Sequence, residues 1–573
     1  MAISDAAWDL SKLMRDEIGD RSADAILGAN PFVGLDPTEM LADVARLMGR
    51  ALLRPEMLAQ HARQLVSELG RILVGRSELE PAAGDRRFAD PSWRDHPLYR
   101  RWMQVYLASS ENLRQVVGEV GFDEKSVQRA DFAVGLLTEA MAPTNFLLGN
   151  PAALKRAFET GGLSLLRGVR HWFDDLRRNG GMPSQVDTRP FRVGKTLAIT
   201  PGSVVHRSEL LELIQYAPAT EAVRTCPLLI VPPQINKYYI LDLAPGRSFT
   251  EYTLKHEHQV FTISWRNPGP EHRDWDMAAY VHAIEEAIEV TSEITGSEDL
   301  NILGACAGGI TTAILMGHLA AAGIPRLHSA TLLVTVVDTE VPSMAGTFAS
   351  ERAIERARKR SARRGVLAGD ELARVFAWLR PNDLVWNYWV NNYLMGNDPP
   401  AFDILSWNND YTNLPAGLHS DFLSLFQENP LLKPGRLSML GTSIDLSRIQ
   451  YESYVVGALT DHITPWKACF RTPALLGGKS QFVLSSSGHI QALVNPPGNP
   501  KSRYLTADED GAGDRSLEAD AWLKRATQHS GTWWDHWIAW LGKQAAQTRR
   551  APRAPGSSLH PALAPAPGQY VRE

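Results

Sequence analysis

Three side chains could together carry out nucleophilic catalysis, and they occur along the chain in the order Cys306, Asp461 and His489. Cys306 lies within Gly304–Gly309 (GACAGG), between a short apolar run and an apolar segment of helical length. A strand, a tight glycine turn and a helix expose the side chain at the apex, and the positive end of the helix favours a thiolate there. The glycines allow the strand and helix backbones to approach closely. The pattern predicts that Cys306 is a nucleophile.

The acid and the histidine each follow a predicted strand. Tyr454–Gly457 runs into the loop of Asp461, and Phe482–Leu484 runs into the loop of His489. Open α/β sheets assemble their sites at the carboxyl ends of strands, and α/β-hydrolases place nucleophile, acid and histidine in this order. A glycine-rich turn alone could instead bind phosphate or only pack tightly, and one of 16 histidines can follow a strand by chance. The joint order of all three residues favours catalysis.

The elements that would position these residues form an α/β pattern. From about residue 191, buried apolar strands alternate with helices, which predicts an α/β-hydrolase fold: a mostly parallel sheet with helices on both faces. We expect a mainly helical N-terminal domain (1–190) and a catalytic domain (191–543) with a cap insertion at about 340–436. The alanine- and proline-rich tail, 544–573, is expected to be disordered.

Composition excludes several classes of protein. A formal charge of −5 over 573 residues gives no basic surface for nucleic acid. Three scattered cysteines are too few for a disulfide scaffold or a zinc motif, which suits a reducing cytoplasm, and no metal or cofactor is predicted. The charged N-terminus lacks the apolar core of a signal peptide, and no apolar run reaches the length of a transmembrane segment.

Beyond the catalytic pattern, the sequence resembles a known family. The segment Gly304–Gly309 matches the G-x-C-x-G-G box of polyhydroxyalkanoate (PHA) synthases, although Ala307 stands where many members have serine. Further segments are similar to signatures of that family: Val231–Tyr239, Ser264–Pro268, Arg380–Trp389, Trp407–Asp410, Gly488–Gln491 and Asn495–Pro500. The resemblance runs from about Trp93 to Trp540 and is closest to the single-component, medium-chain-length (class II) type.

The resemblance implies polymerisation of (R)-3-hydroxyacyl-CoA onto a growing polyester chain. Coenzyme A is then part of the substrate and a product, so no separate cofactor is expected. The resemblance also implies a homodimer in the cytoplasm, at the surface of PHA granules. His489 would deprotonate Cys306, and Asp461 would either orient His489 or help it activate the attacking 3-hydroxyl. The backbone N–H of Ala307 and a second N–H near Ile235 or Asn236 would bind the oxyanion.

Two other functions are compatible with parts of this pattern. A thioesterase or an intracellular polyester depolymerase of the same fold would keep the same three residues. A non-catalytic granule-coating protein would need only the N-terminal helices and exposed tryptophans. We further expect that a tryptophan-rich cap over Cys306 excludes water. The monomer length, the state of the cap, the dimer interface and the role of the tail are left open by the sequence.

Overall fold

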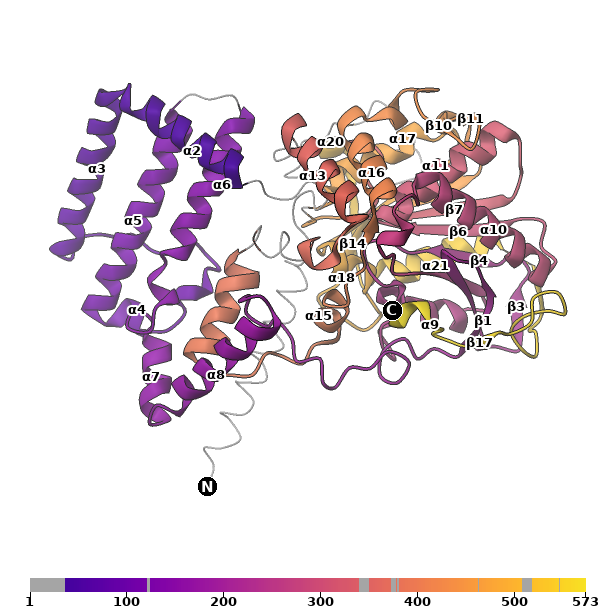
Figure 1. Ribbon diagram of the computed structural model, residues 1–573, viewed down its shortest axis with the longest axis horizontal. Helices are drawn as coiled ribbons and strands as arrows, with labels where there is room; N and C mark the ends of the chain where they lie inside the picture. Colours follow the sequence, from indigo (N-terminus) through magenta and orange to yellow (C-terminus); the bar gives the residue numbers. More distant parts are fainter. Residues whose placement is uncertain are drawn as a thin grey trace. The chain divides into compact units, whose positions relative to one another are not determined.

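The chain forms two compact units in the computed structural model. The structure describes residues 37–120, 124–339, 350–372, 378, 381–461, 463–507, 518–545 and 547–573. Among these, residues 37–187 and 378–400 form a helical unit, and residues 188–372 and 401–573 form a sheet unit (Figure 1). Residues 1–36, which belong to the predicted N-terminal domain, lie outside the described residues.

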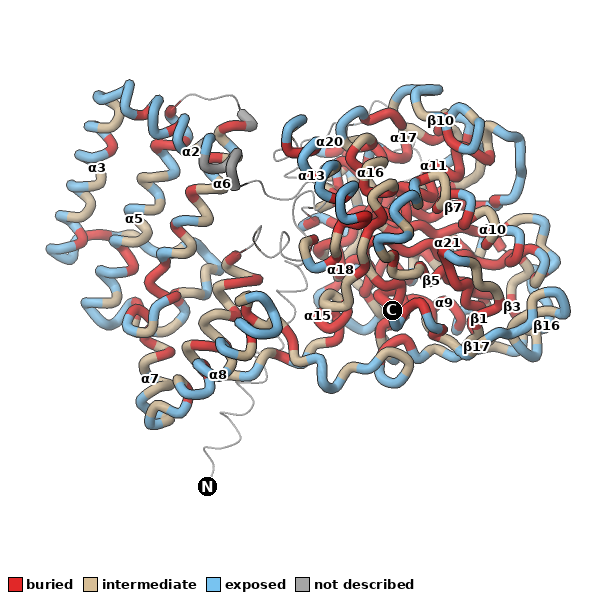
Figure 2. Tube along the Cα trace, viewed as in Figure 1, coloured by how far each residue is buried: buried red, intermediate tan, exposed pale blue. Residues whose placement is uncertain are grey.

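The helical unit is built from amphipathic helices. Apolar side chains from α2, α5 and α6, including Leu47, Val117 and Val134, form a small buried core. The exposed residues of α3 and α5 are visible in Figure 2. The elements of this unit are α2 (Pro37–Leu52), α3 (Pro55–Leu73), η1 (Arg86–Phe88), α4 (Ser92–Asp95), α5 (Pro97–Glu119), α6 (Glu124–Ala140), η2 (Pro143–Asn145), α7 (Pro151–Glu159), α8 (Leu163–Arg178), η5 (Asn382–Trp386) and η6 (Trp389–Leu394).

Residues 378–400 do not belong to a cap in the sheet unit, so that part of the predicted 340–436 insertion was wrong. They complete the helical unit instead. The hydroxyl of Tyr393 donates to Asp175 Oδ2 at 2.7 Å, and Trp389 Nε1 donates to the carbonyl of Asn145 at 3.1 Å. The sequence placed this tryptophan-rich segment in a cap because its pattern does not show which helices it packs against.

The sheet unit contains one large mixed sheet. Its order is β15-β14-β13-β12-β7-β6-β4-β5-β2-β1-β17, and the run from β13 to β5 is parallel. All residues of the central strands β4 to β6 are buried, as expected where helices cover both faces. The strands are β1 (Gly202–Arg207), β2 (Leu211–Tyr216), β4 (Leu228–Val231), β5 (Val260–Trp265), β6 (Leu300–Ala305), β7 (Leu327–Leu333), β12 (Glu452–Ala458), β13 (Ser480–Ser485), β14 (Arg503–Thr506), β15 (Thr527–Ser530) and β17 (Ala564–Pro565).

The remaining elements of the sheet unit are helices and short strand pairs. The helices are α9 (Phe249–Lys255), α10 (Met277–Thr295), α11 (Ala307–Ala322), α13 (Glu351–Arg364), α15 (Asp403–Asn408), α16 (Ala416–Glu428), α17 (Trp466–Leu475), α18 (His489–Leu493), α20 (Ala519–Arg525) and α21 (Trp533–Gln544), with short turns η3 (Tyr238–Leu241), η4 (Pro270–His272), η7 (Pro430–Leu432), η8 (Leu446–Arg448) and η9 (Tyr570–Arg572). The short pairs are β3 (Ala222–Arg224) with β16 (Thr548–Arg550), β8 (Val366–Leu367) with β9 (Leu414–Pro415), and β10 (Ser438–Met439) with β11 (Thr442–Ser443). Among the described helices, none is both long and apolar enough to cross a bilayer.

The C-terminal segment is ordered from residue 547 onward, so the prediction of a disordered tail was wrong. Its strands β16 and β17 pair with β3 and with the edge strand β1. The fully buried carboxylate of Glu212 accepts hydrogen bonds from the backbone N–H groups of Gln569 and Tyr570, at 2.8 and 3.0 Å. Composition misleads here because the segment gains its order from backbone pairing with the sheet rather than from a core of its own.

Candidate active site

Cys306 occupies a strained turn between β6 and α11. Its backbone has φ 51° and ψ −121°, a conformation that costs a residue with a Cβ roughly 1–3 kcal/mol. The turn is held on both sides: the Cys306 N–H donates to the carbonyl of Leu333 at 2.9 Å, and the Cys306 carbonyl accepts from the N–H of Gly309 at 2.9 Å. The side chain is partly exposed, whereas Cys226 and Cys469 are buried. The geometry is that of the nucleophile elbow expected from the sequence.

Two glycines make this turn possible, as the sequence indicated. A Cβ on Gly304 would lie 2.7 Å from the Cα of Gly309, and a Cβ on Gly308 would lie 2.4 Å from the carbonyl oxygen of Pro232. Real Cβ atoms do not approach other atoms so closely, so a side chain at Gly304 would push α11 away from β6, and one at Gly308 would push it away from the end of β4. The glycines therefore set how closely the elbow approaches the loop after β4.

The acid and the histidine meet at the carboxyl edge of the sheet. Asp461 follows β12 and His489 begins α18 just after β13. His489 Nδ1 lies 2.6 Å from Asp461 Oδ2, with the two side chains 4% and 0% exposed. The side chain of Cys306 is near enough to His489 to contribute to the raised pKa of the histidine. Because the carboxylate occupies Nδ1, Nε2 is the ring nitrogen left available to the sulfur.

The positions of Cys306, His489 and Asp461 explain the pKa shifts of the histidine and the aspartate. Burial alone would lower the pKa of His489, but the Asp461 carboxylate and then Cys306 outweigh it and raise the pKa to about 10. Burial in turn favours the neutral acid at Asp461, and the imidazolium together with the Thr464 hydrogen bonds holds its pKa below the ordinary value. The histidine can therefore hold a proton taken from the sulfur at neutral pH.

Thr464 was not identified from the sequence. Its hydroxyl lies 2.6 Å from Asp461 Oδ2 and 3.1 Å from His489 Nδ1, and its N–H donates to Asp461 Oδ1 at 3.0 Å. A threonine three residues after an aspartate is a common turn pattern, which is the only signal that would have pointed to it. His462, the residue after Asp461, lies outside the described residues.

The loop after β4 carries the predicted second oxyanion donor. Ile235 is buried, and Asn236 forms an isolated antiparallel bridge with Tyr411. Trp407 Nε1, from α15, donates to the carbonyl of Lys237 at 2.7 Å, so α15 helps to fix this loop. Ala307, the other predicted donor, is the first residue of α11, where a backbone N–H has no intrahelical acceptor.

Lys237 is a further residue that the sequence did not single out. Its side chain is buried, and its Nζ donates to the carbonyls of Tyr570 and Glu573 at 3.2 and 2.9 Å. The C-terminal segment thus reaches the loop that follows β4. This contact is tertiary, and no local pattern in the sequence indicates it.

Two family models match the chain. Residues 84–253 match the model described as "Poly-beta-hydroxybutyrate polymerase (PhaC) N-terminus". Residues 228–496 match the model of the alpha/beta hydrolase fold, which confirms the predicted fold and spans the strands that carry Cys306, Asp461 and His489.

Curated relatives match the chain over nearly its whole length. The chain is 47% identical to "Poly(3-hydroxyalkanoate) polymerase 1" of Ectopseudomonas oleovorans, over 98% of this chain and 100% of that protein. It is 48% identical to "Poly(3-hydroxyalkanoate) polymerase 2" of the same organism, over 95% and 96%. It is 41% identical to "Poly(3-hydroxyalkanoate) polymerase subunit PhaC" of Cupriavidus necator, over 87% and 85%. The chain therefore belongs to the poly(3-hydroxyalkanoate) polymerase family, as the resemblance of its motifs indicated.

Proposed function

We propose that this acyltransferase polymerises (R)-3-hydroxyacyl-CoA through a covalent intermediate on Cys306. The observation that carries the proposal is the single buried line of groups from Asp461 through His489 to the strained, partly exposed Cys306. Family membership supplies the class of reaction, and this geometry supplies the residues. The motifs shared with class II synthases favour medium-chain monomers.

The first step is exchange of one thioester for another. His489 takes the proton of Cys306, the thiolate attacks the acyl carbonyl, and a bond from carbon to Cys306 sulfur replaces the bond to coenzyme A sulfur. His489 then returns the proton to the leaving thiolate, so coenzyme A departs as a thiol. Because the two thioesters are close in free energy, the acyl-cysteine persists until the next acceptor arrives.

The second step forms the ester. A 3-hydroxyl attacks the acyl-cysteine, its proton passes to His489, and the Cys306 thiolate leaves. Asp461 serves either by orienting His489 or by supporting proton removal from this hydroxyl. The oxyanion of both steps would be bound by the N–H of Ala307 and by that of Ile235 or Asn236. The close packing of Gly308 against Pro232 supports this assignment, since it sets the spacing between the two segments.

The proposed localisation and oligomeric state rest on family membership alone. We propose a cytoplasmic enzyme at the surface of polymer granules, acting as a homodimer. We propose that the helices of the 340–436 insertion that belong to the sheet unit exclude water from Cys306. These are α13, α15, which contains Trp407, and α16. Trp386 and Trp389 belong to the helical unit.

Replacing Cys306 with alanine tests the mechanism. We expect coenzyme A release to fall by at least about 10⁴-fold, because no other group can form the acyl intermediate. Iodoacetamide should label one thiol of the wild type, with protection by substrate, because Cys226 and Cys469 are buried. The control is His282→Gln, an exposed side chain on α10, which should keep full activity.

Two results would count against the proposal. Turnover by a folded Cys306→Ala protein would remove the covalent mechanism. Release of free 3-hydroxy acid in place of insoluble polymer by the wild type would instead identify a thioesterase or depolymerase that uses the same residues.

A further inference from the structure

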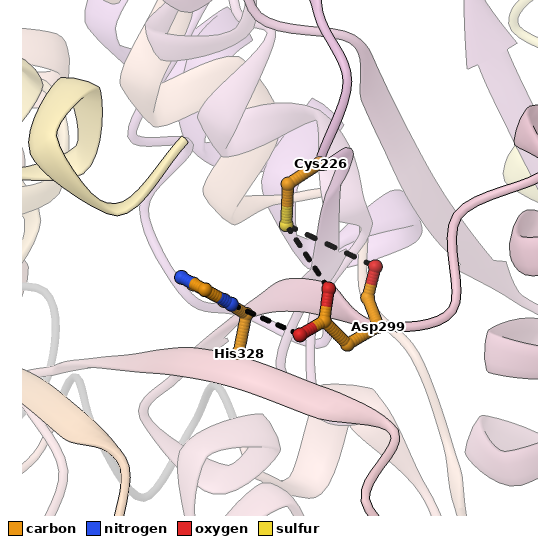
Figure 3. Close-up of side chains that lie close together, drawn as sticks. All are labelled: Cys226, Asp299 and His328. Carbon is orange, nitrogen blue, oxygen red and sulfur yellow. Dashed lines mark hydrogen bonds and ion pairs between the residues drawn. The ribbon is translucent and has the colours of Figure 1, made fainter. Parts of the chain in front are cut away.

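A second set of one cysteine, one aspartate and one histidine lies at the opposite edge of the sheet (Figure 3). Cys226 precedes β4, Asp299 precedes β6, and His328 is the second residue of β7. These strands are parallel neighbours, and Asn301 of β6 is paired with Leu228 of β4 and Ser329 of β7. Parallel pairing therefore brings the three side chains together at the amino ends of the strands.

The potential ligand atoms already lie close to one another. One atom from each residue can be chosen so that all lie within 4.8 Å. His328 Nδ1 is 2.9 Å from Asp299 Oδ2, and Cys226 Sγ is 3.9 Å from Asp299 Oδ1. Tetrahedral zinc, with bonds of about 2.0–2.3 Å, holds its ligand atoms about 3.3–3.6 Å apart. The spread of up to 4.8 Å must therefore contract by about 1–1.5 Å, through rotation of side chains of which two are more than a third exposed.

A buried outer layer holds the sulfur in place. Asn301 Nδ2 donates to Cys226 Sγ at 3.3 Å, and Asn301 Oδ1 in turn accepts from Ser329 Oγ at 2.6 Å. Both residues are 1% exposed. The backbone carbonyl of Asp299 accepts from Ser297 Oγ at 2.7 Å. Hydrogen bonds of this kind orient ligands and raise metal affinity.

Charge and access also fit a cation. A thiolate and a carboxylate carry two negative charges, which a divalent ion neutralises, and the histidine binds as a neutral ligand. Cys226 is buried, but the side chains of Asp299 and His328 are 38% and 40% exposed, which leaves a path from solvent. Burial, and then Asp299, raises the pKa of the Cys226 thiol to about 12, so without an ion the sulfur keeps its proton. A coordinated metal would displace that proton.

We propose that Cys226, Asp299 and His328 bind one zinc-class divalent ion, with water as the fourth ligand. The donor set of one sulfur, one nitrogen and one oxygen selects zinc over calcium or magnesium, which require oxygen ligands. The ion would tie together the starts of β4, β6 and β7. It is a structural ion, because the proposed nucleophile, Cys306, lies at the opposite end of β6.

Cobalt(II) in a Cys306→Ala background tests the site. This background removes the partly exposed thiol, and cobalt reports sulfur ligation directly. We expect one Co²⁺ per chain with a sulfur-to-cobalt charge-transfer band, displaced by Zn²⁺. Adding Cys226→Ser should abolish the band. Adding His328→Ala should weaken binding by at least about tenfold.

Matched controls keep this test decisive. His282 also faces a carboxylate, that of Glu285 at 3.6 Å, so His282→Ala should leave cobalt binding unchanged. His328 is partly exposed, and its replacement should not prevent folding even if Cys226→Ser does. The proposal is overturned if no sulfur-to-cobalt band appears, or if His328→Ala and His282→Ala bind cobalt equally.

Discussion

The two ends of the parallel part of the sheet each carry a cysteine, a histidine and an aspartate, but in a different spatial order. At the carboxyl edge the imidazole of His489 lies between the sulfur of Cys306 and the carboxylate of Asp461. At the amino edge the carboxylate of Asp299 lies between the sulfur of Cys226 and the imidazole of His328. A neighbouring imidazolium favours the thiolate form of a sulfur in general, whereas burial and the neighbouring Asp299 carboxylate raise the pKa of the Cys226 thiol.

The Asp–His pairs at the two ends of the sheet also differ in how far they are buried. The Asp461–His489 pair is almost fully enclosed, while the side chains of Asp299 and His328 are more than a third exposed. Water screens the Asp299–His328 pair, so the electrostatic interaction between these two side chains is weak. Asp461 and His489 are shielded from water, so each strongly shifts the pKa of the other. The same three residue types therefore differ in chemistry because their spatial order and their burial differ.

The prediction with the largest expected effect removes the negative charge of Asp461 beside the imidazole of His489, the proposed catalytic base. We expect Asp461→Asn to lower coenzyme A release by about 10²–10⁴-fold, since the amide can neither stabilise an imidazolium nor hold the same tautomer. Asp398→Asn is the control, because Asp398 also faces a histidine, His171 at 3.3 Å, but is 70% exposed; its activity should stay near that of the wild type.

Single-turnover labelling of the cysteine separates the two roles of Asp461. If Asp461→Asn slows elongation more than the first acylation, Asp461 supports proton removal from the attacking 3-hydroxyl. Equal losses in both steps would assign it to orientation of His489. An Asp461→Asn enzyme with unchanged turnover would break the contrast between the two edges.

A smaller effect is expected from crowding the elbow with Gly308→Ala. The added Cβ would lie 2.4 Å from the carbonyl oxygen of Pro232 and 2.6 Å from that of Val231, so α11 must shift. We expect kcat to fall by about tenfold or more and stability to fall by about 1–3 kcal/mol. Gly118 in α5 has open space at the same position, and Gly118→Ala should be neutral or slightly stabilising in urea unfolding.

The pH dependence of stability should also distinguish the enclosed pair. The pKa of His489 is raised from 6.5 to about 10 in the folded state, so its contribution is fully present below pH 6.5 and is lost as the pH rises toward 10. Urea unfolding should therefore show the free energy of unfolding falling across this window, and His489→Gln should flatten that fall. An identical slope in both proteins would show that the histidine is not held as an imidazolium.

The smallest expected effect is the interaction energy between Asp299 and His328, the exposed pair. In the presence of a chelator, a double-mutant cycle with Asp299→Asn and His328→Gln should give a coupling energy below about 1 kcal/mol, as for other exposed ion pairs. A coupling above about 2 kcal/mol would show that solvent does not screen the amino edge, and the contrast in enclosure would then fail.

Much of the fold and the proposed catalytic set followed from local pattern. Apolar strands followed by glycine turns or loops marked the carboxyl edge, and the order Cys306, Asp461, His489 matched the fold, because a parallel sheet brings such loops to one edge. Thr464 was missed because its role depends on side-chain contacts with two other residues. The ordered tail was missed because its composition does not reveal the edge strand it pairs with.

The sequence by itself determined the strand and helix pattern, the elbow at Cys306 and the family. Only the tertiary structure decided that residues 378–400 join the helical unit, that Lys237 contacts the C-terminal segment, and that Cys226, Asp299 and His328 meet. The physical reason is that periodicity reports how the backbone near a residue is built. Which distant side chains touch depends on strand order and register. The residues around Cys226 and around His328, about 100 positions apart, carry no local signal of that order.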